Sequence, residues 1–133
     1  MPDASPPAAV PRAAARWTPP VLWLAIVLVG TSWPKLVLGP DGLGLDKVAH
    51  FSAYAILAAL SLRATLTPRR LTTLVAVLAG VSLLGAVDEW HQSFIPGRSM
   101  SFADWVADTA GAGLGVLAVR FVPFLTPRRR PLP

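Results

Sequence analysis

The 133-residue chain contains no cysteine, and only 14% of its residues are charged. The lack of cysteine excludes disulfide bonds, thiolate nucleophiles and thiolate metal ligands, so any chemistry must use oxygen and nitrogen groups. A typical soluble domain carries about 25% charged residues. This deficit, together with 53% hydrophobic residues, indicates a protein whose main partner is the lipid bilayer.

Acidic residues are few: 7 acids face 12 basic residues, which gives a net charge of +5. A basic patch on a soluble fold would indicate a nucleic-acid partner. Here long apolar stretches separate the basic residues from one another. The sequence therefore predicts no nucleic-acid binding.

Four apolar stretches begin near Pro19, Lys47, Leu71 and Phe102, and each is long enough to cross a hydrocarbon core about 30 Å thick. They predict an all-α fold, an integral membrane bundle of four transmembrane helices over residues 19–126. Pro19 stands at a favoured helix-start position. A signal peptide is the alternative for the first stretch, but no small-x-small cleavage site follows it, which favours an uncleaved anchor.

The two ends of the chain differ from this apolar middle. Residues 1–18 are rich in proline and alanine without an apolar stripe, and they predict a disordered tail. Residues 127–133 predict a basic C-terminal tail.

In the fourth apolar stretch, Ala107, Gly111 and Gly115 recur every four residues, a spacing that lets helices approach closely in lipid. We therefore expect the fourth helix to pack tightly against a neighbour.

The basic residues are distributed unevenly between the two ends of the predicted bundle. Nine arginines fall in the tails and in the connection near residues 63–70, whereas the opposite end holds only Lys35, Lys47 and Arg98. The positive-inside rule then predicts a multi-pass membrane protein with both termini in the cytoplasm. Six acids fall at the extracytoplasmic end: Asp41, Asp46, Asp88, Glu89, Asp104 and Asp108.

Polar residues at this end recur at a spacing of four, which places them on one face of a helix. Because antiparallel neighbours joined by short connections lie side by side, three such faces are expected to converge on one extracytoplasmic cleft. Between the third and fourth helices, the "FIPGRS" stretch predicts a Pro-Gly turn that carries Arg98. The spaced groups are Asp46, His50 and Tyr54 in the second helix, Asp88 and Gln92 in the third, and Asp104 and Asp108 in the fourth, with Glu89 beside Asp88.

One interpretation of these residues is a functional site. Carboxylates and a histidine can exchange protons near neutral pH. Oxygen ligands from Asp88, Glu89, Asp104 and Asp108 would also suit a divalent cation. The predicted catalytic residues are Asp46, His50, Asp88, Glu89, Asp104 and Asp108. The predicted substrate-binding residues are Lys47, Tyr54, Gln92 and Arg98.

The other interpretation is structural. Asp46 and Asp104 could cap the second and fourth helices, where a negative charge favours the positive end of the helix dipole. Asp108 lies a turn inside an apolar helix, where an ionised carboxylate is costly, so it should be paired with His50 or Arg98. Arg98 could also neutralise two carboxylates and hold the loop in place.

The segments "DKVAHFSAYAIL" and "DEWHQSFIPGRSMSFADWVADTAGAGLG" resemble the VanZ-like family of small bacterial membrane proteins. One position departs from the family pattern, since Asp108 stands where asparagine is most often expected. The resemblance implies a location in the bacterial inner membrane and a link to low-level resistance against the glycopeptide teicoplanin, which is associated with the naming member. The matching residues are Asp46, Lys47, His50, Phe51, Tyr54, Asp88, Glu89, Gln92, Phe94, Pro96, Gly97, Arg98, Asp104 and Gly111.

Two functions of different classes follow from these observations. The first is an enzyme or binding protein that acts on a cell-wall precursor or a lipid head group at the outer membrane surface. The second is a non-catalytic scaffold or partner subunit, in which the polar residues form a structural ion-pair network between helices and the chain pairs with itself or a membrane partner. A transporter or channel is disfavoured because no polar path continues to the cytoplasmic side.

Overall fold

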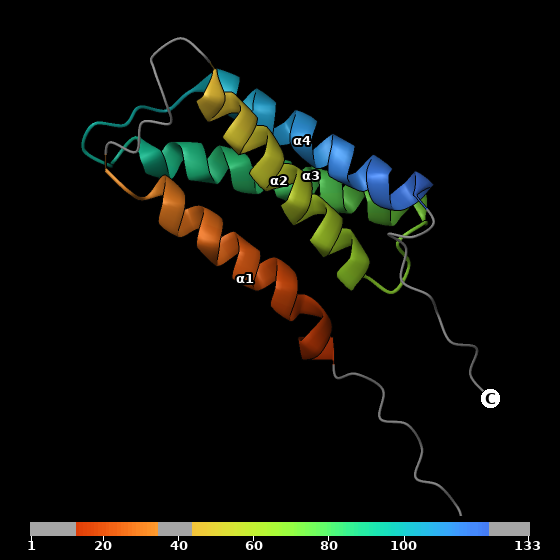
Figure 1. The fold of residues 1–133 in the computed structure, drawn as a ribbon. Helices are drawn as coiled ribbons and strands as arrows, with labels where there is room; N and C mark the ends of the chain where they lie inside the picture. The colour runs from red at the N-terminus through yellow and green to blue at the C-terminus, as the bar shows by residue number, and fades with distance from the viewer. Residues whose placement is uncertain (1–12, 35–43, 123–133) are drawn as a thin grey trace, which may run out of the picture.

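The computed structural model describes residues 13–34 and 44–122. All regular structure in this part is helical, in the order α1 (Ala13–Thr31), α2 (Leu45–Ala64), α3 (Leu71–Gln92) and α4 (Phe102–Phe121) (Figure 1). The all-α prediction is confirmed, and each helix is long and apolar enough to cross a membrane. Residues 1–12, Lys35, Asp41 and the basic tail at 127–133, on which the sequence also made predictions, lie outside the described residues.

Helix α1 begins at Ala13, so the predicted start at Pro19 is wrong. Alanine has the highest helix propensity, and residues 13–15 are all alanine. Pro19 and Pro20 lie inside the helix, where each removes one backbone hydrogen bond. A transmembrane helix tolerates such prolines when hydroxyl groups satisfy nearby carbonyls. Thr18, just before the prolines, donates its hydroxyl to the Ala14 carbonyl over 3.1 Å, whereas the carbonyls that lose their partners are those of Ala15 and Arg16.

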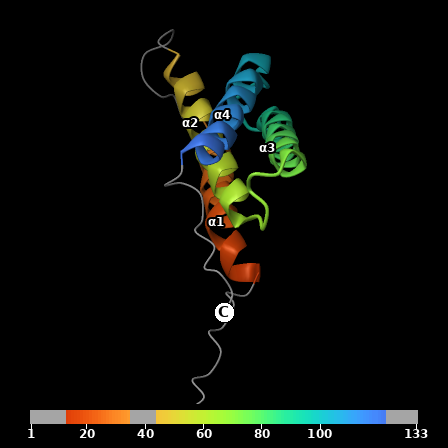
Figure 2. The same cartoon turned by 90° about the vertical axis from the view of Figure 1, so that its right-hand side faces the viewer.

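The closest packing in the bundle is between α2 and α4. A Cβ atom added at Gly111 would overlap the carbonyl oxygen of Phe51, and one at Gly115 would overlap that of Ala55. The close packing predicted from the small-residue spacing on α4 is therefore confirmed, because only glycine lets the two backbones come this near. Figure 2 shows α4 lying across α2, with α3 at its side.

Helix α1 lies at the edge of the bundle and packs mainly against α2, with fewer contacts to α3. The indole nitrogen of Trp23 donates to the Ala53 carbonyl over 2.9 Å and joins the two helices midway. The apolar core runs along α2 and is completed by the other three helices. Its buried side chains are Val27, Tyr54, Leu57, Ala58, Leu62, Val81, Ala112, Val116 and Val119.

The four helices alternate in direction, so one end of the bundle collects the last turns of α1 and α3 and the first turns of α2 and α4 (Figure 1). The opposite end holds the short connection at residues 65–70. This topology brings the polar segments of α2, α3 and α4 to the same end.

A buried polar cluster at one end of the bundle

Seven of the predicted site residues meet between α2, α3 and α4, and we call them the polar cluster. Five are almost fully buried: Tyr54 and Asp88 are each 1% exposed, Glu89 is 2%, Gln92 is 3% and Asp108 is 0% exposed. Helical spacing puts them on inward faces, because positions three and four apart lie on the same side of a helix. The polar cluster consists of His50, Tyr54, Asp88, Glu89, Gln92, Asp104 and Asp108.

Asp88 is surrounded by hydrogen-bond donors and accepts from three side chains. The Thr31 hydroxyl of α1 donates to Oδ1 over 2.8 Å, and the Tyr54 hydroxyl of α2 donates to Oδ2 over 3.2 Å. The Gln92 amide, one turn along α3, donates to Oδ2 over 3.4 Å. Three helices therefore converge on one carboxylate.

His50 connects α2 with the acids of the other two helices. Its Nδ1 atom lies 2.9 Å from Oδ1 of Asp108 and 3.8 Å from Oε1 of Glu89. Of the two partners predicted for Asp108, the structure thus places His50 beside it. The imidazole is 10% exposed, so it reaches from the buried acids toward the surface of the bundle.

Gly85 on α3 makes room for the carboxylate of Asp108. A Cβ atom at Gly85 would lie 3.0 Å from Oδ2 of Asp108 and 3.3 Å from Cε1 of Tyr54. This Oδ2 atom is buried and has no hydrogen-bond partner among the described residues. Such an oxygen costs free energy unless a water molecule or a proton on the carboxyl group satisfies it.

Glu89 organises the start of α4. The N-cap residue of α4 is Ser101, whose hydroxyl accepts from the backbone N–H of Asp104 over 3.2 Å. In a capping box the third helical residue would bind the N–H of the cap residue. Here Glu89 of α3 takes that place, because its Oε2 accepts from the Ser101 N–H over 2.7 Å. Asp104 therefore does not cap α4 with its side chain.

Asp104 and Asp46 instead share the ammonium group of Lys47 at the rim of the cluster. Lys47 Nζ lies 3.1 Å from Asp104 and 3.0 Å from Asp46. The side chains of Lys47 and Asp46 are 46% and 54% exposed, so both are accessible from outside the bundle. The predicted capping role of Asp46 is wrong, because α2 is preceded by Gly44 in a left-handed conformation, with φ 64°, and no side-chain cap.

The predicted Pro-Gly turn is present between α3 and α4. Pro96 and Gly97 occupy its centre, Gly97 has φ 83°, and the Arg98 N–H donates to the Ile95 carbonyl over 3.0 Å. This is the arrangement of a type II turn, which needs a residue able to adopt positive φ at its third position. The turn directs Arg98 back toward the polar cluster.

Arg98 does not clamp carboxylates in the described part of the chain. Its Nη1 donates to Oε1 of Gln92 over 2.9 Å, and its Nε donates to the Trp33 carbonyl over 3.3 Å. The prediction that Arg98 neutralises two acids is therefore wrong for the residues described. The turn holds the Arg98 guanidinium against Gln92. The Gln92 amide nitrogen in turn donates to Asp88 and Glu89, so Gln92 lies between Arg98 and these acids.

The charges of the cluster are not balanced by the described cations. The ion pairs of its four carboxylates involve only Lys47 and His50 among the described residues. Asp88 and Glu89 also lie near the C-terminal end of α3, where the helix dipole is negative and disfavours carboxylates. Buried acids in a membrane protein are costly and usually mark a functional site.

A divalent cation would fit part of this cluster. His50, Glu89 and Asp104 each offer one ligand atom, and these atoms lie within 4.8 Å of one another. The predicted ligand set was four carboxylates, but Asp88 is occupied by hydroxyl and amide donors. Imidazole together with carboxylates suits Zn²⁺ better than an all-oxygen set does.

Sequence reasoning missed two residues of the site and one that shapes it. Thr31 lies at the end of α1, and its hydroxyl reaches Asp88. Ser101 supplies a backbone donor to Glu89. Gly85 provides space for Asp108. A serine three residues before an acid is a recognisable helix-start pattern, so Ser101 had a signal in the sequence, whereas Thr31 and Gly85 had none.

Comparison with known families agrees with the motifs. A family model described as VanZ/LLP1 matches residues 9–123. The chain belongs to the VanZ/LLP1 family. The match extends over all four helices and every residue of the polar cluster, so the family resemblance predicted from the two motifs is confirmed. No curated protein and no solved structure matches the chain.

Proposed function

We propose that this VanZ/LLP1 protein binds and acts on the polar head group of an envelope lipid or lipid-linked wall precursor, at a cleft on the extracytoplasmic membrane surface. The observation that carries the proposal is the contact between His50 and Asp108 at 2.9 Å. A buried carboxylate beside an imidazole fixes the ring and stabilises its charged form after it takes up a proton.

The direction of proton transfer follows from the donors involved. When Asp108 is ionised its carboxylate can only accept, and the His50 Nδ1 atom then carries the hydrogen that meets it. The Nε2 atom then has a free lone pair and is able to accept a proton from a hydroxyl group or a water molecule. His50 is therefore the proposed general base, and Asp108 orients it.

The rim of the cluster supplies the groups that would hold an anionic head group. The Lys47 ammonium group is half-exposed beside Asp104, and Arg98 is held by Gln92 in a partly exposed position. Both cations can turn toward a phosphate without uncovering the core. Asp88 and Tyr54 lie beneath, and we assign them the role of positioning Gln92 and closing the floor of the site.

A second candidate, the structural network, is favoured by the three donors on Asp88. Thr31, Tyr54 and Gln92 come from three helices, and removing their shared acceptor would leave buried donors unsatisfied. A scaffold or partner subunit would need this connection and nothing more. The two candidates differ in what they predict for His50, which contributes no hydrogen bond to Asp88.

The experiment compares His50→Gln with His91→Gln, since His91 is the other histidine, lies on α3 and is exposed. The purified variants are assayed for thermal unfolding and for co-purified envelope lipids by mass spectrometry, and expressing cells for teicoplanin susceptibility. We expect His50→Gln to lose the lipid bound at the polar cluster and to abolish any effect of the protein on teicoplanin susceptibility, while its melting temperature stays near that of the unaltered protein. His91→Gln should leave all three readouts unchanged.

Four further variants separate the two candidates: His50→Ala, Asp88→Asn, Arg98→Ala and Asp104→Asn. A large drop in melting temperature for every one would favour the structural network and contradict the proposed site. Normal melting for the rim variants Arg98→Ala and Asp104→Asn, together with lost lipid, would support it.

A further inference from the structure

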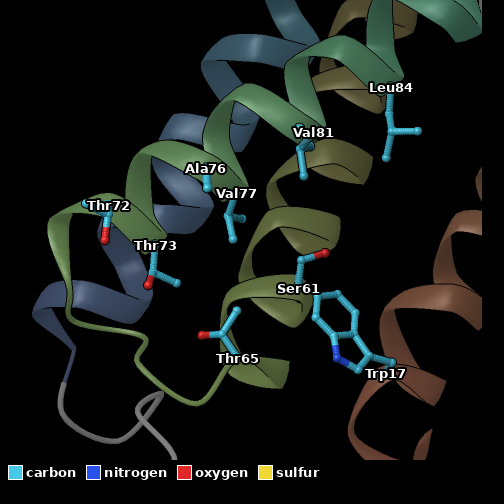
Figure 3. A pocket seen from close by; sticks show the side chains of 10 residues that line it. Trp17, Ser61, Thr65, Thr72, Thr73, Ala76, Val77, Val81 and Leu84 are labelled. Atoms are coloured by element: carbon cyan, nitrogen blue, oxygen red, sulfur yellow. The ribbon is translucent and has the colours of Figure 1, made fainter. Parts of the chain in front are cut away.

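A groove lies between α1, α2 and α3, at the end of the bundle opposite to the polar cluster (Figure 3). Its volume is about 500 Å³, which is within the range of roughly 300–1,000 Å³ typical of ligand pockets. Trp17 of α1 forms one wall, and Val81 and Leu84 of α3 lie on the facing side. The hydroxyl groups of Thr65 and Thr73 gather at the end nearest the connection between α2 and α3.

The position of the groove determines what can fill it. Its walls belong to helices that are long and apolar enough to span a membrane, and α1 diverges from α3 on this side (Figure 1). A void between such helices forfeits dispersion contacts, whereas an acyl chain restores them along the apolar wall. The groove therefore has the shape and chemistry for one hydrocarbon chain with a polar group at the threonine end.

The charge at this end is positive. Arg16 precedes Trp17, and Arg69 and Arg70 lie in the connection beside Thr73. All acids in the described part of the chain lie at the opposite end, in the polar cluster or beside it at Asp46. Basic residues near the ends of transmembrane helices attract anionic lipid head groups, at about 1 kcal/mol for each residue.

From this arrangement we infer that the groove binds one anionic phospholipid. An acyl chain lies along Val77, Val81 and Leu84. The phosphate faces Arg16, Arg70 and the hydroxyl groups of Thr72 and Thr73, because the Thr65 hydroxyl already donates to the Leu62 carbonyl over 2.7 Å. The site is separate from the polar cluster, so the inference does not rest on the proposed function.

The test uses the full chain, stripped of lipid in detergent, with phosphatidylglycerol and phosphatidylcholine of identical acyl chains as probes. Binding is measured by native mass spectrometry. We expect tighter binding of phosphatidylglycerol, with one lipid in the groove of each chain, a lipid that His50→Gln leaves in place. Arg16→Gln and Arg70→Gln should each weaken phosphatidylglycerol binding roughly fivefold and leave phosphatidylcholine unchanged. Arg120→Gln on α4 is the matched control, because it removes a charge at the same end of the bundle but outside the groove.

A second variant fills the groove directly. A Cβ atom at Gly80 would meet nothing within 4 Å, so Gly80→Leu should fold normally while its side chain occupies the space of the acyl chain. Gly113 on α4 is equally open and serves as the control. We expect Gly80→Leu to weaken binding of both lipids by at least about tenfold and Gly113→Leu to have no effect.

Three results would overturn the inference. Equal affinity for the two lipids would show that the groove does not select an anionic head group. Equal behaviour of Gly80→Leu and Gly113→Leu would place the bound lipid elsewhere. A dimer that Gly80→Leu converts to a monomer would show that a second copy of the chain occupies the groove.

Discussion

The Asp108 carboxylate on α4 lies 2.9 Å from the His50 imidazole on α2, and its second oxygen faces Gly85 on α3. Three helices thus meet at one buried carboxylate. Glu89 stands 3.8 Å from the same imidazole, so His50 is the point at which the acids of α3 and α4 come together.

Replacing Asp108 with asparagine, the residue expected most often in the family pattern, removes the ionisable group but keeps the shape of the side chain. The amide oxygen still accepts from His50, so we expect the free energy of unfolding to change by less than about 1 kcal/mol. Asp108→Leu removes the acceptor and should cost about 1–3 kcal/mol. Chemical denaturation of the purified variants measures both. Equal losses for the two variants would contradict the role of Asp108 as a hydrogen-bond acceptor. If His50 is the base, Asp108→Asn should also reduce the effect of the protein on teicoplanin susceptibility.

Adding a methyl group at Gly111 tests the close approach of α2 and α4. Gly111→Ala places a Cβ atom on the Phe51 carbonyl, and we expect a loss of about 1–3 kcal/mol or more in the free energy of unfolding. Gly113→Ala, on the same helix with open space at its Cβ position, should be neutral or slightly stabilising. The packing would need revision if both variants unfolded alike in a denaturant titration.

The hydrogen bond from Thr31 to Asp88 predicts that α1 is tied to the polar cluster. Thr31→Val keeps the shape of the side chain but removes the donor to a buried carboxylate, at an expected cost of about 1–3 kcal/mol. Thr18→Val removes an exposed hydroxyl on the same helix and should cost less. The measurement is the melting temperature of each variant. Equal values would mean that the hydrogen bond from Thr31 to Asp88 does not stabilise the bundle.

The positive φ of Gly97 predicts that the turn carrying Arg98 cannot accept a side chain without strain. Gly97→Ala should cost about 1–2 kcal/mol and displace Arg98 from Gln92. Gly30→Ala, at a glycine without positive φ and with nothing near its Cβ position, is the control. Under the proposed function, Gly97→Ala should also lower the amount of lipid that co-purifies with the protein. If Gly97→Ala and Gly30→Ala retained equal amounts of lipid, the turn would have no part in lipid binding.

The distribution of arginines predicts the orientation of the bundle. A fluorescent protein fused to the C-terminus should fluoresce, because it folds in the cytoplasm, and alkaline phosphatase at the same position should be inactive. Inserted between α3 and α4, the phosphatase should instead be active. The reverse pattern would place the polar cluster on the cytoplasmic side and exclude an extracytoplasmic ligand.

Several features of this protein follow from the sequence alone, because they depend on local order along the chain. Hydropathy predicts four membrane-spanning helices, and the spacing of polar residues predicts that α2, α3 and α4 turn polar faces inward at one end. The Pro-Gly dipeptide predicts a turn, and the glycines of α4 predict close packing. The two motifs identify the family, which the match over residues 9–123 confirms.

Only the tertiary structure decides which polar groups meet, because this depends on how far each helix is rotated and how closely its axis approaches the next. Spacing allows Asp108 to pair with His50 or Arg98, and the tight contact at Gly111 brings α2, with His50, against α4. The same packing leaves Arg98 above Gln92 and brings Thr31 of α1 to Asp88, a contact that no spacing within one helix can reveal.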